Sequence, residues 1–329
     1  MTASTPTSGG TGEGSNGAIV QVSEYLEAGP VNRVALDLAA AIQRFGGNSK
    51  IVSGGGLMVA EAQRANVEHE TISISSVNPI GNPAGKIAGK LTEWDAQLVH
   101  SHGEDAAGLV IKAVGKHRVP HVVSLYDLPV RRNGKPTPGL QTALKGDRVL
   151  LASPFLQNLL SEAGYLHDVN ASVVPPGLAV NALHPSVVTA ARLTRMVRDM
   201  EITAQSPVIL FPAALQASAG YDAVIEALKQ HLDKTWVCLF IGVGQAERRY
   251  HYRLSQKLEA EGLERRIKIY EGTEDPATLY KLTDIVISTV NGNLAFDYAC
   301  AESQAAGKVV LGANNGSTAL PVDPGGVRM

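Results

Sequence analysis

Two histidines separated by a single residue, His100 and His102, are the first side chains in the sequence that could do chemistry. They follow a short apolar run and precede Gly103. A His-x-His pair can bind a metal ion, but a metal site needs further ligands, and no convincing third ligand is visible. A role in a substrate cleft and a structural role in hydrogen bonding are the other two interpretations of this pair.

Three further polar residues stand in apolar surroundings. Tyr126 and Asp127 follow the apolar run 121–125, where they could hold a substrate hydroxyl or simply cap a loop. Glu302 lies in a stretch of small, mostly apolar residues, and a carboxylate on such a face needs a partner, for which a ligand hydroxyl is one candidate. His102, Tyr126 and Asp127 are weak candidates for catalysis, and no catalytic residue is assigned from these patterns.

Glycines recur at the ends of the expected strands, where a parallel α/β sheet binds its ligands. Glycine lets the backbone approach a phosphate, and the helix that follows offers free N–H groups. The Gly-Val-Gly motif at Gly242 and Gly244 is either a ligand contact or an ordinary turn. The full dinucleotide fingerprint of six residues is absent, which argues against an NAD enzyme. The glycines concerned are Gly29, Gly103, Gly177, Gly242, Gly244 and Gly272.

Helix-like and strand-like segments alternate along the chain, which predicts doubly wound parallel sheets. The alternation stops in the charged segment 181–206, which we expect to be irregular, and restarts at Val208. We therefore predict two Rossmann-like domains that face each other across a cleft, with the turns at the glycines on its walls. Their expected bounds are a disordered tail at 1–17, a first domain at 18–187, a linker at 188–206 and a second domain at 207–329.

The composition and charge of the chain argue against several classes of protein. The 329 residues carry a formal net charge of −2, which lacks the positive charge that nucleic-acid binders use. No apolar run is long enough to span a bilayer and no secretory signal is visible, so we expect a cytoplasmic protein without a transmembrane segment. Cys238 and Cys300 are expected to be buried thiols, and Ser153 before Pro154 predicts a helix N-cap.

The order of the motifs resembles the family-4 retaining glycosyltransferases of the GT-B fold. In the first half, "IVQVSEYLEAGPVNRVALDLAAAIQRFGG" is similar to the opening strand, Gly-rich loop and helix of that family, and "AQLVHSHGEDAAG", "GDRVLLASPFLQNLL" and "VVPPGLAVNALHP" resemble its later landmarks. In the second half, "PVILFPAALQASAGYDAVIEAL", "VCLFIGVGQ", "IKIYEGTEDPATLYKLTDIVIST" and "AFDYACAESQAAGKVVLGANNG" resemble its donor domain in the right order.

The resemblance implies a nucleotide-sugar donor, a glycan or glycolipid acceptor, and a role in making cell-envelope polysaccharide or glycolipid. Peripheral membrane contact is compatible with such a role. The family generally needs no catalytic metal, and the sequence lacks an Asp-x-Asp motif, so no metal or cofactor is expected. The base and ribose of the donor are expected near Gly272, Thr273 and Glu302. The complete set of binding candidates is Gly29, Arg33, Gly242, Gly244, Gly272, Thr273 and Glu302.

Several catalytic positions of the family are replaced in this chain. Ala214 and Ala219 stand where the family holds the donor diphosphate with an arginine and a lysine. Leu294 stands in place of the carboxylate that contacts the transferred sugar, and Tyr126 in place of a cleft histidine. The positions of an aspartate after Pro-Pro-Gly-x and of a glutamate before Arg33 read Ala179 and Asn32.

The sequence alone also allows a two-domain ligand-binding protein of another family, but the serial order of the motifs argues against it. The replacements, together with a C-terminus shorter than usual for the family, leave two main hypotheses. The chain is either a glycosyltransferase that works with altered residues or a non-catalytic homologue that acts as a binding or partner subunit. In both cases we expect poor turnover of standard nucleotide sugars, because alanine supplies no charge to a departing diphosphate.

Overall fold

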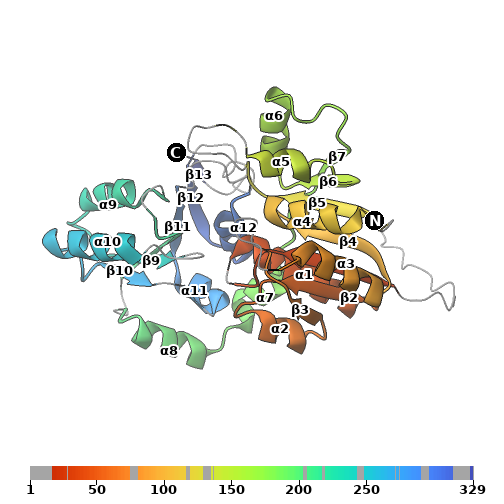
Figure 1. Ribbon diagram of the computed structural model, residues 1–329. Helices are drawn as coiled ribbons and strands as arrows, with labels where there is room; N and C mark the ends of the chain where they lie inside the picture. Colours follow the sequence, from red (N-terminus) through yellow and green to blue (C-terminus); the bar gives the residue numbers. More distant parts are fainter. Residues whose placement is uncertain are drawn as a thin grey trace, which may run out of the picture.

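The computed structural model contains two α/β domains, each organised around one parallel sheet (Figure 1). It describes residues 17–329 apart from 28, 75–80, 116–118, 129–134, 136, 203–205, 217–218, 243–247, 271, 274, 290–295, 314–326 and 329. The expected disordered tail therefore lies almost wholly outside the described residues, as do Gly244 and Leu294. No helix in the described part of the chain has both the length and the apolar character needed to cross a bilayer.

The N-terminal sheet has seven parallel strands in the order β3-β2-β1-β4-β5-β6-β7. Its inner strands carry fully buried apolar residues such as Val20, Val99 and Val123, because helices cover a parallel sheet on both faces. The strands are β1 (Ala18–Ser23), β2 (Ser49–Ser53), β3 (Glu68–Thr71), β4 (Ala96–His102), β5 (His121–Leu125), β6 (Arg148–Leu151) and β7 (Ala171–Val173). The helices between them are α1 (Pro30–Arg44), α2 (Val59–Arg64), α3 (Pro83–Glu93), α4 (Glu104–Val114), α5 (Pro138–Ala143) and α6 (Pro154–Glu162).

The C-terminal sheet has six parallel strands in the order β10-β9-β8-β11-β12-β13. Its strands are β8 (Val208–Ala213), β9 (Val237–Gly242), β10 (Ile267–Tyr270), β11 (Ile285–Ser288), β12 (Val309–Gly312) and the two-residue β13 (Val327–Arg328). Its helices are α9 (Tyr221–Lys229), α10 (Arg248–Ala260), α11 (Pro276–Leu282) and α12 (Tyr298–Ala305). Two doubly wound domains, as the alternation predicts, are confirmed.

The strand order of each sheet reverses at one point, between β1 and β4 and between β8 and β11. Loops on either side of such a reversal lead away from each other and leave a crevice at the carboxyl ends of the strands. In this chain those ends are Ser23 and His102 in the first domain and Ala213 and Ser288 in the second. Candidate ligand groups are therefore sought along these two edges.

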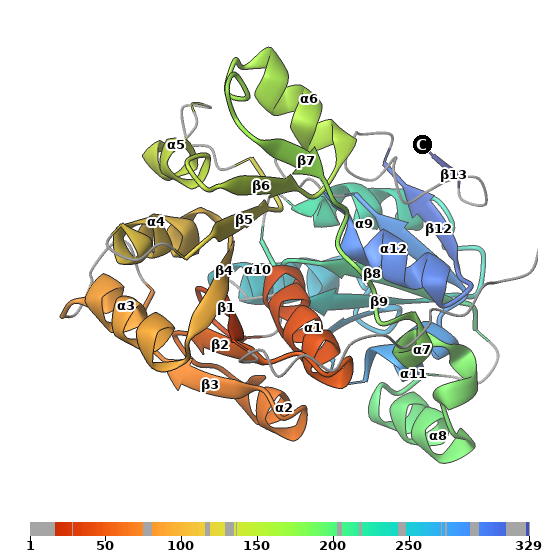
Figure 2. The ribbon, with the colours of Figure 1, turned by 90° about the vertical axis from the view of Figure 1, so that its right-hand side faces the viewer.

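The described residues of the segment 181–206 connect the two domains without a strand, as expected, but much of the segment is helical, so the expectation of an irregular linker is wrong there. The segment contains the end of α7 (Val180–Leu183), the 3-10 helix η1 (Pro185–Val187) and α8 (Ala190–Asp199). Charged residues occupy the outer face of α8, while Met196 and Val197 pack against the core of the C-terminal domain, so its periodicity is that of a half-covered surface helix. Figures 1 and 2 both show α8 beside α11, at the edge of that domain.

One buried apolar cluster joins the two domains. Most of its members come from the N-terminal domain, around Val123, Leu125 and Tyr126, but Phe296 and Tyr298 come from the C-terminal domain. Figure 2 shows the corresponding ribbon arrangement, with α12 beside α1 and α7. Burial of aromatic side chains across the domain boundary favours one relative orientation of the domains.

Candidate functional site

A pocket of about 240 Å³ opens where α1, α7, α8, α11 and α12 meet, so that both domains and their connection form its wall. Its charged and hydroxyl-bearing residues are Arg33, Asp37, Arg192, Asp275, Tyr298 and Glu302. Of the glycine turns expected on the cleft walls, Gly177 lines this pocket. The turns at Gly29, Gly103 and Gly242 are not part of the lining of this pocket, and their place on the cleft wall stays a prediction.

Arg33 enters the pocket from α1 as the centre of an ion-pair network. Its Nη2 lies 2.8 Å from Oδ1 of Asp37 and 2.9 Å from Oε1 of Glu61, and its Nη1 donates to Oε2 of Glu61 at 3.0 Å. The spacing of Arg33 and Asp37, four residues apart on one helix, puts the two side chains side by side. The guanidinium that the sequence suggests for ligand binding is therefore already held by two carboxylates.

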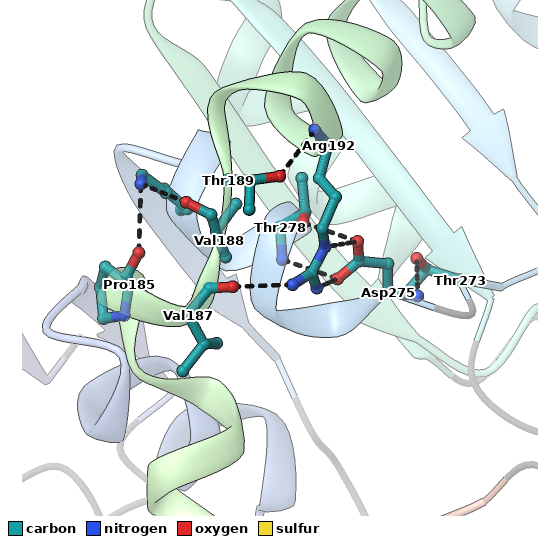
Figure 3. A network of polar contacts seen from close by, with 9 residues as sticks. Pro185, Val187, Val188, Thr189, Arg192, Thr273, Asp275 and Thr278 are labelled. Atoms are coloured by element: carbon teal, nitrogen blue, oxygen red, sulfur yellow. Dashed lines mark hydrogen bonds and ion pairs between the residues drawn. The ribbon is translucent and has the colours of Figure 1, made fainter.

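Arg192 of α8 makes a second ion pair at the opposite wall (Figure 3). Its Nε and Nη2 donate to the two oxygens of Asp275 at 2.9 and 2.5 Å, and its Nη1 donates to the carbonyl of Val187 at 2.9 Å. Asp275 also caps α11, because its Oδ1 accepts from the backbone N–H of Thr278 at 3.0 Å. Hydrogen bonds from Arg192 and Thr278 lower the pKa of Asp275 to about 2.

Glu302 and Tyr298 present oxygen atoms from successive turns of α12. The hydroxyl of Tyr280 donates to Oε2 of Glu302 at 2.8 Å, so a phenol supplies the partner that this carboxylate needs. Burial raises the pKa of Glu302, and the Tyr280 hydrogen bond opposes that shift. Tyr298 is only 8% exposed, and its hydroxyl has no hydrogen-bond partner among the described residues.

The weak catalytic candidates His102 and Tyr126 lie together, but in the core of the N-terminal domain. The Tyr126 hydroxyl is 2.7 Å from Nδ1 of His102, and Nε2 of His102 is 2.9 Å from Oε1 of Gln21. Both side chains are at most 5% exposed, because β4 continues to His102 and carries it inside the sheet. The Tyr126 hydroxyl is therefore buried beside His102, whereas its neighbour Asp127 is exposed.

His100 has a hydrogen-bond partner inside the domain, as the structural interpretation of the His-x-His pair requires. Its Nε2 lies 2.8 Å from the hydroxyl of Ser124, and its ring lies 4.3 Å from that of His102. In the described part of the chain, no three His, Cys, Asp or Glu side chains are grouped so that they could hold a metal ion.

The remaining candidate glycines lie at two separate places in the structure, one beside the end of β9 and one at the start of α1. Gly242 ends β9, and a Cβ on Gly272 would lie 3.7 Å from its carbonyl oxygen, so these two positions are neighbours. Thr273 accepts a hydrogen bond from the backbone N–H of Asp275 at 3.1 Å, which joins this edge to the pocket wall. Gly29 is the N-cap of α1 and supplies no side-chain cap, which leaves the first N–H groups of that helix accessible to a ligand.

Hydrogen bonds hold the backbone beside the two alanine positions that follow β8. The Tyr221 hydroxyl donates to the carbonyl of Ala213 at 2.9 Å, and the Thr289 hydroxyl donates to the carbonyl of Ala219 at 2.8 Å. Gly220, with φ +90°, is required there because a Cβ would lie 2.4 Å from the Thr289 hydroxyl. The loop is thus held at both ends, but Ala214 and Ala219 add no charge to it.

Four pocket residues, Asp37, Arg192, Asp275 and Tyr298, escape the sequence analysis. Asp275 before Pro276 is a recognisable N-cap signal, and Asp37 follows Arg33 at helical spacing, so both could have been found. Arg192 and Tyr298 give no such signal, since their positions depend on how α8 and α12 pack.

Comparison with known proteins agrees with this geometry. The model of glycosyltransferase family 4 matches residues 30–181, and that of glycosyl transferases group 1 matches residues 195–325. No curated protein matches the chain in sequence.

Solved structures with the same architecture share few residues with the chain. A glycosyltransferase from Rickettsia africae has 22% identity and a TM-score of 0.78, covering 94% of this chain and 84% of its own. The HepE protein of Anabaena, solved with UDP-glucose, has 17% identity and a TM-score of 0.81, covering 95% and 85%. WaaG, a glycosyltransferase of lipopolysaccharide biosynthesis, has 15% identity and a TM-score of 0.68, covering 94% and 86%.

Two facing parallel-sheet domains with a pocket at their junction define the GT-B class of proteins. With one family model on each domain, the chain belongs to the family-4 glycosyltransferases.

Proposed function

We propose that this chain binds a nucleotide-sugar donor of the kind used by retaining glycosyltransferases and that it transfers the sugar slowly or not at all. The observation that carries the proposal is the loop after β8, whose backbone is held in place while Ala214 and Ala219 replace the two cations of the family. A retaining transfer needs the charge of the departing diphosphate to be stabilised as the glycosidic bond breaks.

The other cations near the pocket do not compensate for these alanines. Arg33 is paired with Asp37 and Glu61, and Arg192 is paired with Asp275. A cation already held by a carboxylate offers a phosphate less net charge than a free one. The pocket wall therefore supports binding of the uncharged part of a donor better than catalysis at its diphosphate.

The donor is expected to approach along the edge formed by Gly242 and Gly272. Thr273 and Glu302 stand at the positions where the family holds the base and ribose, and Glu302 lines the pocket. The solved structures of HepE with UDP and with UDP-glucose support a nucleotide sugar as the ligand class. Among the described residues, the N-terminus of α1 at Gly29, which has no side-chain cap, is a further candidate place for a phosphate.

A glycan or glycolipid acceptor, and a place in cell-envelope synthesis at the cytoplasmic side, belong to the same proposal. Their support is the family and the likeness to WaaG. The alternative of a non-catalytic binding or partner subunit is favoured by one feature. Tyr126, at the position of the family's cleft histidine, lies buried against His102 and is unavailable to an acceptor.

Titration calorimetry with a panel of nucleotide sugars and free nucleotides tests the proposal. We expect measurable binding of at least one nucleotide sugar, weakened in Glu302→Gln, a variant that keeps a hydrogen-bond acceptor for Tyr280. If none of the nucleotide sugars binds to the folded protein, the proposed function is wrong.

A further inference from the structure

The helix α10 lies on the outer side of the C-terminal domain, away from the N-terminal domain (Figure 1). One face of the helix is buried, because Tyr250, Leu254 and Leu258 pack into the core of that domain and are at most 6% exposed. The opposite face is exposed to solvent from the first turn of the helix to the last, and we call it the outer face of α10. Along it lie Arg249, Tyr252, Arg253, Gln256, Glu259 and Ala260.

The two ends of this outer face carry opposite charges. Arg249 and Arg253 stand in the first half of the helix, and Glu259 stands in its last turn. Within the described part of the chain, none of these three side chains has an ion-pair partner. By contrast, Nζ of Lys257 lies 2.6 Å from Oδ1 of Asp222 on the neighbouring helix α9. The helix therefore pairs a charge beside α9 within the domain and leaves the charges of its outer face free for a partner.

The order of these free charges does not stabilise the helix that carries them. The N-terminus of a helix is partially positive and its C-terminus partially negative, so acidic residues stabilise the first turn and basic residues the last. The first turn of α10 contains Arg249 and no acidic residue, and its last turn contains Glu259 beside the paired Lys257. Folding of the single chain does not account for this arrangement, whereas contact with a surface of the reverse polarity does.

A second copy of α10 in antiparallel alignment is a surface of that reverse polarity. Antiparallel alignment sets the basic half of each helix against the acidic last turn of the other, and it also places the two helix dipoles in opposite directions. A two-fold axis makes each contact twice, because the same face serves both copies. Tyr252, which lies between the two arginines and is 65% exposed, supplies an aromatic contact of the kind that is enriched at interfaces.

We propose that the protein forms a homodimer through antiparallel pairing of α10 with α10 of a second copy. The helix has 13 residues and a length of about 20 Å, so the contact is smaller than the interface of a permanent dimer. A dissociation constant of about 10–100 µM is therefore expected. The lining of the pocket at the domain junction includes no residue of α10. Dimerisation does not depend on the proposed function, so either can be refuted without the other.

Sedimentation velocity of the unmodified protein, at concentrations from about 5 to 200 µM, tests whether it dimerises. We expect a reversible equilibrium between monomer and dimer that weakens about fivefold or more between roughly 50 and 300 mM salt, because salt screens exposed charges. A protein that remains monomeric at the highest concentration in low salt would overturn the proposal.

Two charge reversals distinguish antiparallel pairing of α10 from any other contact. Arg249→Glu and Glu259→Arg should each weaken the dimer about tenfold or more, because each places like charges opposite one another. An equimolar mixture of the two variants should dimerise again, since each altered residue then faces an opposite charge on the other chain. Both substitutions should keep or raise the stability of the monomer, because they make the end charges agree with the helix dipole, so loss of the dimer would not come from unfolding.

Arg44→Glu makes the same change of charge at an exposed arginine of the N-terminal domain and is the matched control. It should leave the dimer unchanged. Equal weakening by Arg44→Glu, or a mixture of Arg249→Glu and Glu259→Arg that stays monomeric, would overturn the antiparallel pairing. Retention of a monomeric protein on heparin, lost in Arg249→Glu, would assign the outer face to an acidic polymer and would also overturn the proposal.

Discussion

Arg192 and Asp275, 83 positions apart in the sequence, form a two-point ion pair between the connecting helix α8 and the start of α11. The carboxylate of Asp275, the N-cap of α11, accepts from both the Arg192 guanidinium and the backbone N–H of Thr278. Asp275 thus ties α8 to α11 through Arg192. Its negative charge also lies at the N-terminus of α11, where it offsets the partial positive charge of that helix end.

Asp275 both caps α11 and pairs with Arg192, and two substitutions that remove both roles or only the ion pair should lower the stability by different amounts. Asp275→Ala is expected to lower the free energy of unfolding by about 1–2 kcal/mol, because a helix cap is lost together with the ion pair. Asp275→Asn keeps a capping oxygen and should lose less than about 1 kcal/mol, as expected for a largely exposed ion pair. Urea unfolding measures both, and equal losses in the two variants would contradict the capping role.

The stability of the N-terminal domain should depend on pH through its buried histidines. Burial lowers the pKa of His100 and of His121 to about 4, whereas an unfolded chain has histidines near pH 6.5. Between these values the unfolded state binds more protons, so stability is fully present above about pH 6.5 and is lost as the pH falls towards 4.

Urea midpoints at about pH 7, 5.5 and 4.5 measure this loss, for which we expect about 2 kcal/mol or more by the lowest pH. His121→Gln, which keeps a partner for Ser101, should show a shallower pH dependence than the unmodified protein. A flat profile between about pH 6.5 and 4.5 would show that these histidines do not titrate on unfolding.

Local patterns in the sequence predict most of the fold. Ser153 caps α6 by accepting from the N–H of Leu156 at 3.2 Å, as its place before Pro154 predicts, and Cys238 and Cys300 are buried. The helix α8 was missed although its pattern is local. Met196 and Val197 share the face that packs against the C-terminal core, charged residues cover the rest, and Thr189 caps the helix.

Glu302 should contribute separately to folding and to ligand binding. Glu302→Ala removes the acceptor of the Tyr280 hydroxyl and is expected to lower the free energy of unfolding by about 1–3 kcal/mol. Glu302→Gln should stay close to the unmodified stability and still bind the pocket ligand more weakly, since an amide is a poorer acceptor than a carboxylate. Thermal unfolding and titration of both variants measure the two effects, and unchanged affinity in Glu302→Gln would exclude a ligand contact.

Only part of the candidate site could be predicted from the sequence, and the reason is physical. Glu302 was found because a carboxylate in an apolar helix pattern needs a partner, and Arg33 was found through the resemblance to the family; both line the pocket. The sequence does not reveal what that partner is. The ion pair of Arg33 with Glu61 and the burial of Tyr126 against His102 depend on contacts between elements distant in the chain.

Steady-state turnover of nucleotide sugars, by transfer or by hydrolysis, tests the central claim most directly. The unmodified protein is expected to turn over well below about 1 s⁻¹, because Ala214 and Ala219 leave the diphosphate charge unstabilised. Ala214→Arg, Ala219→Lys and Leu294→Glu introduced together should raise the rate of donor hydrolysis, although by less than the product of single effects, since such groups act as a unit. A turnover of about 1–10 s⁻¹ in the unmodified protein, the range of an ordinary enzyme, would contradict the account.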